Sequence, residues 1–189
     1  SHLKECSGKK VVLMINAGNA NAGTGKIGAK DVLTCCKSVG QELGISYESV
    51  LPFSTGVIGE PLKTKKYVNA FLKASKQLKD NNWRKAAKSI LTTDTKPKLL
   101  SALIRSGSKE IAITGFAKGS GMIRPDFATL LSFVFIDAKL NKTLLESIHN
   151  EALAMSFNKI TVDGDTSPND SSILVASGKA KENIKKGWV

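Results

Sequence analysis

Residues 118–131 read KGSGMIRPDFATLL, in which a lysine and a glycine-rich turn lead to Ala128 and Thr129. The apolar run that follows, TLLSFVFIDAKL at 129–140, predicts a buried strand. A buried threonine needs a partner for its hydroxyl. The same hydroxyl is a nucleophile when a base and a pocket for negative charge lie beside it. Thr129 is therefore a candidate for a chemical role at the start of a strand.

Signals for strands and helices alternate on both sides of this stretch. Short apolar runs that end in small residues predict strands, and apolar residues at helical spacing predict helices. The expected strands lie at 11–18, at the start of 47–62, and at 109–119, 129–140 and 158–167; the expected helices lie at 29–44, 65–79, 81–93 and 140–157. Because both kinds of element come in clusters and no linker separates them, we expect an α+β domain of layered sheets and helices over residues 1–189.

Composition indicates a globular chain. Of its 189 residues, 41% are apolar, which is enough to bury a core. No apolar stretch is long enough to span a membrane, and SHLKECSGKKVVLM at the start has too short an apolar segment for a signal peptide. We expect a cytoplasmic protein without membrane contact. A lone Cys6 and the adjacent Cys35 and Cys36 suit neither disulfides nor zinc, so all three are expected to be reduced thiols.

A net charge of +12 raises the question of nucleic-acid binding. The lysines, however, are spread along the chain, and the few aromatic residues do not interleave with them as base-stacking platforms would. We expect no nucleic-acid partner and interpret most of the charge as a solvated surface. An anionic small substrate or an acidic partner stays open as an explanation for the rest.

Two glycine-containing loops resemble binding motifs but fail their tests. NAGNANAGTGKIG has Ile27 where a P-loop needs serine or threonine after its lysine. DGDTSPND, residues 163–170, alternates oxygen-bearing side chains as a calcium loop does, but Leu174 stands where the loop needs a glutamate. The second loop is therefore expected to be a structural turn, and no metal or bound cofactor is predicted.

Thr129 has no histidine near it in sequence to serve as its base, since the chain has only His2 and His149. An N-terminal threonine solves this problem, because cleavage before the residue frees an α-amine with a pKa of about 8. The Ala128–Thr129 bond is chemically suited to such a cleavage. On these residues alone, a threonine that merely starts a strand remains the alternative.

Further motifs accompany the stretch in a definite order. INAGNANAGTG stands at 15–25, STG at 54–56, TTDT at 92–95 and ITVDGDTSPND at 160–170. Together with KGSGMI, a proline and the AT-L-L run, this set resembles the ornithine acetyltransferases, the glutamate N-acetyltransferase enzymes of arginine biosynthesis. The resemblance covers nearly the whole chain.

The resemblance implies a role for individual residues. Thr129 matches the nucleophile, which becomes the first residue of a β-chain when the precursor cleaves itself between Ala128 and Thr129. Thr55 and Gly56 match the pair that forms the oxyanion hole.

Further residues match substrate contacts, namely Lys118, a threonine of TTDT assigned to Thr95, and Thr129 itself. The family's chemistry requires no metal or cofactor.

The resemblance also implies a reaction and an assembly. The acetyl group of N-acetylornithine passes through acetyl-threonine to glutamate, and acetyl-CoA is an open second donor. The α and β chains are expected to form an α2β2 heterotetramer with a fold resembling the N-terminal-nucleophile hydrolases. Family precursors are longer than this chain, so residues 1–189 are expected to be a fragment that spans the cleavage site. Two alternatives stay open: a self-processing aminopeptidase or amidase, and an uncleaved domain without chemistry.

Overall fold

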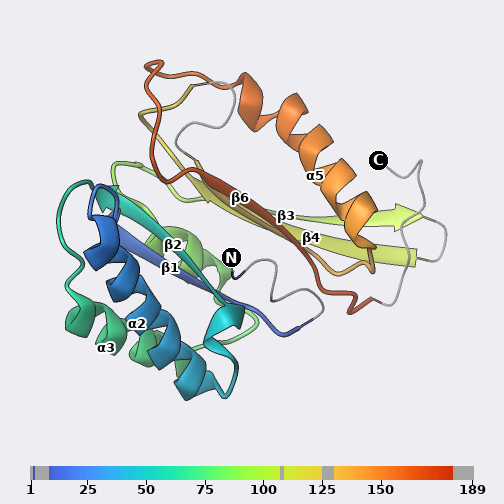
Figure 1. Ribbon diagram of the computed structural model, residues 1–189. Helices are drawn as coiled ribbons and strands as arrows, with labels where there is room; N and C mark the ends of the chain where they lie inside the picture. Colours follow the sequence, from blue (N-terminus) through green and yellow to red (C-terminus); the bar gives the residue numbers. More distant parts are fainter. Residues whose placement is uncertain (1, 3–8, 107–108, 125–129, 181–189) are drawn as a thin grey trace. The chain divides into compact units, whose positions relative to one another are not determined.

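The computed structural model describes residue 2 and residues 9–106, 109–124 and 130–180. The chain forms two compact units, Ser1–Thr92 and Thr93–Val189, and each is described by itself. Both combine a β-sheet with α-helices (Figure 1). The α+β prediction is therefore confirmed. That both units belong to one acetyltransferase domain stays a prediction.

The first unit is built on a pair of parallel strands, β1 (Val12–Asn19) and β2 (Val50–Val57). The α-helices of this unit are α2 (Gly25–Leu43), α3 (Thr64–Ser75) and α4 (Trp83–Ser89), and a 3₁₀ helix, η1 (Tyr47–Ser49), precedes β2. A parallel pair needs a crossover, and α2 supplies it. Gly44 ends α2 in the left-handed conformation (φ 64°), as its place after the apolar pattern predicted.

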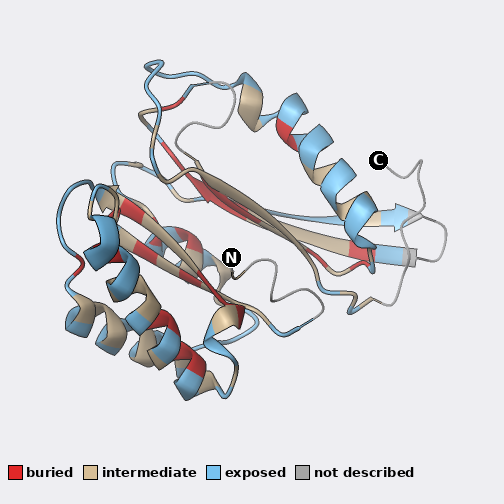
Figure 2. Ribbon diagram, viewed as in Figure 1, coloured by how far each residue is buried: buried red, intermediate tan, exposed pale blue. Residues whose placement is uncertain are grey.

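The core of the first unit lies between α2 and the two strands. Figure 2 shows buried positions along β1, β2 and α2. Its buried members are Met14, Cys35, Cys36, Val39, Val50 and Leu62. Cys35 and Cys36 are free, which confirms the prediction for these two thiols, whereas Cys6 lies outside the described residues. Burial raises the pKa of the Cys36 thiol to about 11, so it is inert at neutral pH.

The second unit is a four-stranded sheet in the order β3-β4-β5-β6. Its strands are β3 (Lys98–Ser106), β4 (Lys109–Lys118), β5 (Leu131–Ile136) and β6 (Ser171–Ala176). The first three pair antiparallel, whereas β5 and β6 pair parallel. Helix α5 (Lys142–Met155) makes the parallel crossover and lies along one face of the sheet (Figure 1).

Apolar side chains of β4 and β5 hold the second unit together. Phe133 is fully buried and its ring lies 5.3 Å from that of Phe116. Ile111 and Ile136 form a further buried cluster with Ala138. Packing of these side chains therefore fixes the two central strands, β4 and β5, against each other.

The predicted strand at 158–167 is wrong. A 3₁₀ helix, η2 (Phe157–Lys159), is followed there by an irregular turn, and the next strand begins only at Ser171. Ile160 and Val162 are exposed, so the β-branched residues that suggested a strand have no core to face. β3 and β6 were not expected.

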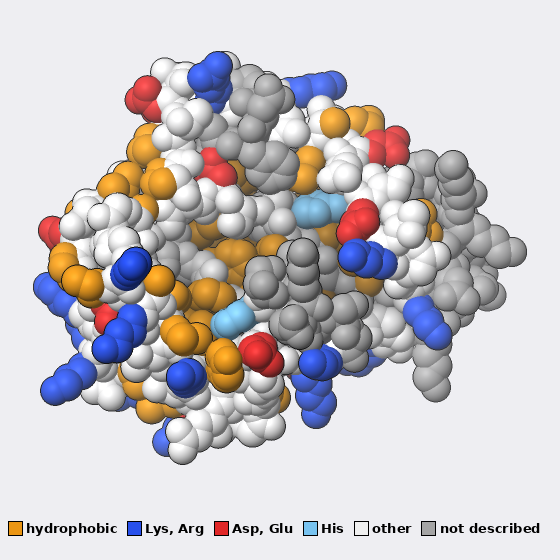
Figure 3. All heavy atoms as spheres, viewed as in Figure 1, with side chains coloured by type: hydrophobic (Ala, Val, Ile, Leu, Met, Phe, Trp, Pro, Cys, Tyr) orange, Lys and Arg blue, Asp and Glu red, His pale blue; other side chains and the backbone are white. Residues whose placement is uncertain are grey.

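Lysine and arginine side chains lie at many separate places on the face shown in Figure 3, in agreement with their spread along the sequence. Within the described part of the chain, every helix is too short or too polar to cross a membrane.

Candidate active site

Two of the sequence motifs meet in the first unit, at the carboxyl ends of β1 and β2. The register pairs Ala17 with Thr55 and Gly18 with Gly56, so INAGNANAGTG and STG lie side by side. Thr55 is buried. The carboxyl ends of parallel strands are where ligands bind in open α/β sheets.

Gly56 cannot be replaced by a larger residue without a shift of the backbone. Its φ is +130°, in a region that favours glycine. A Cβ at this position would lie 2.3 Å from the carbonyl carbon of Gly18 and 2.6 Å from the backbone nitrogen of Asn19. The sequence STG therefore has a glycine because β1 and β2 approach each other closely at this point.

Asparagine side chains hold the loops around this point. Asn16 accepts a hydrogen bond from Ser54 (2.7 Å) and donates one to the backbone of Asn19 (2.8 Å). Asn19 in turn donates to the carbonyl of Glu60 (3.0 Å) and accepts from the backbone N–H of Asn21 (2.8 Å). These amides tie both glycine-rich loops into one arrangement, so the asparagines of INAGNANAGTG have a structural role that their spacing alone did not reveal.

Other motifs meet in the second unit, at one end of the sheet. Lys118, the last residue of β4, pairs with Leu131, the first residue of β5, and Leu131 pairs with Ser171, the first residue of β6. Lys118 is buried, with 5% of its surface exposed. The strand register therefore places the buried Lys118 opposite Leu131, two residues after Thr129 in the chain.

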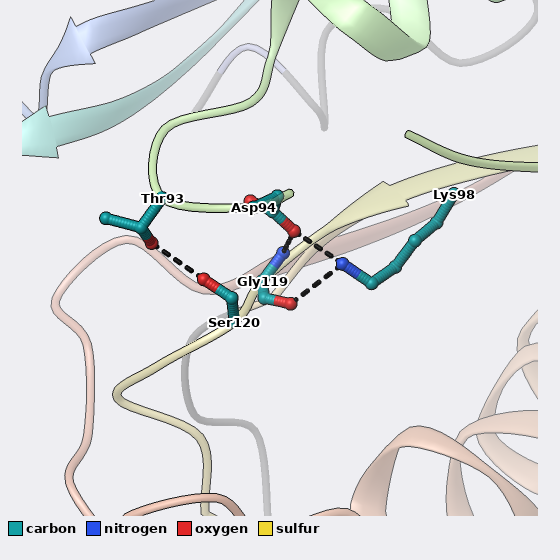
Figure 4. Close-up of polar contacts among 5 residues, drawn as sticks. All are labelled: Thr93, Asp94, Lys98, Gly119 and Ser120. Carbon is teal, nitrogen blue, oxygen red and sulfur yellow. Dashed lines mark hydrogen bonds and ion pairs between the residues drawn. The ribbon is translucent and has the colours of Figure 1, made fainter. Parts of the chain in front are cut away.

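A hydrogen-bonded cluster holds the turn after Lys118 (Figure 4). Asp94 Oδ1 accepts from the backbone N–H of Gly119 (2.9 Å) and from the Lys98 ammonium (2.5 Å). Lys98 also donates to the carbonyl of Gly119 (3.0 Å). The hydroxyls of Thr93 and Ser120 lie 2.7 Å apart. TTDT thus fixes the KGSG turn through Thr93 and Asp94.

Burial and neighbouring charges together set the pKa values of Lys118 and Asp94. Burial lowers the pKa of Lys118, and the nearby Lys98 lowers it further, whereas Asp94 and Asp170 oppose the shift. For Asp94, burial alone would raise the pKa, but hydrogen bonds from Lys98 and Gly119 and the charges of Lys98 and Lys118 hold it below its ordinary value. The Asp94 side chain is fully buried, and its Oδ2 has no hydrogen-bond partner within the described ranges. Asp94 therefore keeps its carboxylate charge near the buried Lys118.

The structure does not place the other predicted site residues beside Lys118. Thr95 is exposed on the loop that carries Asp94. Ala128 and Thr129 lie outside the described residues. Thr55 and Gly56 belong to the first unit, whereas Lys118 belongs to the second. The roles of all these residues stay predictions.

Sequence reasoning missed Asp94 as part of the site. The sequence feature that marks Asp94 is the TTDT motif, in which one acidic residue stands among threonines shortly before β3. Among the residues that the structure describes, no group of histidine, cysteine, aspartate and glutamate side chains is arranged to hold a metal ion.

Comparison with known proteins gives one family match over nearly the whole chain. The ArgJ family model matches residues 1–188. The chain is 47% identical over 168 residues to the arginine biosynthesis bifunctional protein ArgJ of Colwellia psychrerythraea, which covers 89% of the chain and 40% of that relative. It is 46% identical over 169 residues to the protein of the same name from Methylococcus capsulatus, covering 89% and 41%. The chain thus spans about two fifths of the length of these curated relatives.

Solved structures give a similar result. The crystal structure of the arginine biosynthesis bifunctional protein ArgJ of Bacillus halodurans matches with a TM-score of 0.57 and 31% identity, over 69% of this chain and 68% of that one. The ornithine acetyltransferase of Mycobacterium tuberculosis, complexed with ornithine, matches with a TM-score of 0.54 and 23% identity over the same shares, which is a likeness of fold.

Proposed function

The chain belongs to the ArgJ family, and we propose that the protein containing it transfers an acetyl group from N-acetylornithine to glutamate. The observation that carries this proposal is the pairing of buried Lys118 with Leu131. It brings a cation, suited to a substrate carboxylate, to the strand that follows the proposed nucleophile Thr129.

The protein first prepares its own nucleophile. Thr129 Oγ attacks the carbonyl carbon of Ala128, the C–N bond between the two residues breaks, and the hydroxyl proton passes to the Thr129 nitrogen. Water then hydrolyses the resulting ester, which leaves a carboxylate on Ala128 and restores the Thr129 hydroxyl. The free α-amine, with an ordinary pKa of about 8, becomes the general base.

Acetyl transfer then takes two steps. The Thr129 hydroxyl attacks the acetyl carbonyl of N-acetylornithine, the amide C–N bond breaks, and ornithine leaves with the proton on its amine. The amine of glutamate attacks the acetyl-threonine, so the ester C–O bond breaks and Thr129 regains its proton. Thr55 and Gly56 supply donors to the negative oxygen that forms in each step.

The proposal extends to substrates, assembly and compartment. Lys118 and Thr95 contact the substrate, acetyl-CoA is a second donor, and the cleaved α and β chains form an α2β2 heterotetramer in the cytoplasm. Neither a metal, a bound cofactor, a nucleic acid nor a membrane takes part. Family membership supports these assignments as a set, and the burial of Lys118 at the end of β4 supports its own role.

Initial-rate kinetics of the full-length protein test the proposal. With N-acetylornithine and glutamate varied together, we expect parallel double-reciprocal plots, because the donor product leaves before the acceptor binds. Incubation with N-acetylornithine alone should add one acetyl group to the fragment that begins at Thr129, as measured by mass spectrometry. Hydrolysis of peptides without acetyl transfer would contradict the proposal and favour an aminopeptidase.

A further inference from the structure

Two aspartates of the ITVDGDTSPND motif contact the segments that border residues 124–129. These are Asp163 and Asp170, which lie in the turn between α5 and β6. Each accepts hydrogen bonds from backbone N–H groups about 40 positions earlier in the chain. The sequence predicted a structural turn here, and the proposed reaction gives the motif no role.

Asp163 binds the backbone of Met122 and Ile123, the upstream border of residues 124–129. Its Oδ2 accepts from the N–H of Met122 (2.6 Å) and its Oδ1 from the N–H of Ile123 (3.1 Å). The carbonyl of Ile123 accepts from the backbone N–H of Val162 (2.9 Å) and from the Thr161 hydroxyl (3.2 Å). Backbone N–H groups, that of Met122 foremost, lower the pKa of Asp163, so its charge persists at neutral pH.

The backbone conformation of Met122 is unfavourable and needs contacts that stabilise it. Its φ is +55°, in the left-handed region that a residue with a side chain adopts only at an energetic cost. Such a conformation persists where neighbouring contacts determine it, and the bond to Asp163 is one of them.

Asp170 binds the backbone of Leu130, the downstream border of residues 124–129. Its Oδ1 accepts from the N–H of Leu130 (2.8 Å), and the carbonyl of Leu130 accepts from the N–H of Ser171 (2.9 Å). Leu130 therefore has both backbone polar groups bonded to the start of β6. Asp170 also faces Lys118 and favours its ammonium form against the larger effect of burial.

We propose that Asp163 and Asp170 are positioning residues for self-cleavage, because they fix Met122, Ile123 and Leu130, the described residues before and after the Ala128–Thr129 bond in the chain. The inference rests on the proposed function. Charge-assisted hydrogen bonds to backbone N–H groups are shorter and stronger than neutral ones, so the two aspartates restrict the backbone at Met122, Ile123 and Leu130.

The two aspartates differ in what they hold after the cut. Asp163 is bonded to residues that remain on the α-chain side, upstream of Ala128. Asp170 is bonded to Leu130, which stays covalently attached to Thr129. Loss of Asp163 should therefore impair mainly the cleavage, whereas loss of Asp170 should impair cleavage and then acetyl transfer.

The experiment measures cleavage of the full-length protein by intact mass over time, followed by the transfer kcat of each variant once it is fully cut. We expect Asp163→Ala and Asp170→Ala to slow cleavage about tenfold or more. Asp170→Ala should then lower kcat more than Asp163→Ala does. The asparagine variants, which keep an acceptor oxygen, should lie between alanine and wild type and replace the alanine variants if those do not fold. Asp165→Ala, an exposed position in the same turn, is the matched control and should cleave at the wild-type rate.

The outcomes separate this inference from the proposed function. If the wild-type protein cleaves but folded Asp163 and Asp170 variants cleave equally fast, the inference is wrong and the proposed function stands. If both variants lose cleavage and transfer in equal measure, together with thermal stability, the aspartates support the fold and do not position the reacting segment. An uncut wild-type protein would overturn both.

Discussion

The STG region of the first unit and the KGSG region of the second are both held in place by polar contacts, but of different kinds. Around Gly56 the contacts are neutral, from asparagine amides to backbone groups and hydroxyls. Around Gly119 they are ionic, from Asp94 and Lys98. The first arrangement depends on shape and on the absence of a side chain, and the second depends on charge. They should therefore respond differently to substitution and to pH.

The largest effect is expected for Gly56→Ala. The added Cβ would clash with the Gly18 backbone, 2.3 Å from its carbonyl carbon, and alanine disfavours the positive φ. We expect the free energy of unfolding to fall by about 3 kcal/mol or more, as measured by urea denaturation.

Gly59→Ala is the matched control, because Gly59 also has a positive φ (82°) but open space around its Cβ position. It should cost only about 1–2 kcal/mol. Equal costs for the two variants would show that the close approach of β1 and β2 is unimportant.

Lys118→Ala removes the buried ammonium of the KGSG region, and its effect is measured as a change in kcat/KM. A buried ammonium that faces the substrate carboxylate should be worth about 2 kcal/mol in kcat/KM. Lys118→Arg should restore activity only in part, because the planar guanidinium is larger than the ammonium it replaces. Steady-state kinetics with N-acetylornithine and glutamate decide the matter, and near-wild-type rates for the alanine variant would make Lys118 a structural residue.

Asp94→Asn should reduce stability in a pH-dependent way. The pKa of Asp94 is held below its ordinary value, so the folded chain binds fewer protons than the unfolded chain. Its contribution, about 1–2 kcal/mol, is present above the unfolded pKa of about 3.9 and is lost as the pH falls through the lower folded value.

Unfolding measured from pH 7 down to about pH 2 should therefore show a constant gap between the wild-type protein and Asp94→Asn until about pH 4, and a narrowing gap below it. Gly56→Ala should keep its full cost at every pH, since no charge is involved. A gap for Asp94→Asn that stays constant over the whole range would mean that its contribution is steric.

The smallest effect is expected for Thr93→Val. Its hydroxyl lies 2.7 Å from that of Ser120, and both residues belong to the exposed part of the cluster. We expect about 0.5 kcal/mol or less in unfolding free energy. Ser120→Ala should cost as much, and the double variant no more than either, unless the two hydroxyls act independently.

The apolar pattern of the sequence, as a short run or at helical spacing, was enough to predict several elements. β1, α2 and α5 follow this rule, and a glycine at the end of α2 marked its end correctly. Prediction of elements from the apolar pattern failed where the apolar residues are exposed. Leu100 and Leu103 of β3 are exposed, so this strand has no clean alternation, and the exposed Ile160 and Val162 suggested a strand that does not form.

The candidate site was predictable only in part. The motifs around Thr55 and Lys118 stand out by their small residues and their resemblance to a family. Asp94 and Asp170 reach the Lys118 region because strands distant in sequence pair at one end of the sheet, and no local pattern encodes that pairing. Register is set by the whole sheet, so the motifs marked these carboxylates in the sequence but only the structure shows that they lie near Lys118.

The intact mass of the full-length protein, beside that of its Thr129→Ala variant, tests the central claim most directly. The account predicts that the wild-type protein yields two chains, the second beginning at Thr129, because the same hydroxyl performs the self-cleavage and the later acetyl transfer. The variant should remain a single chain. A wild-type protein that stays uncut, or a variant that splits at the same bond, would contradict the account.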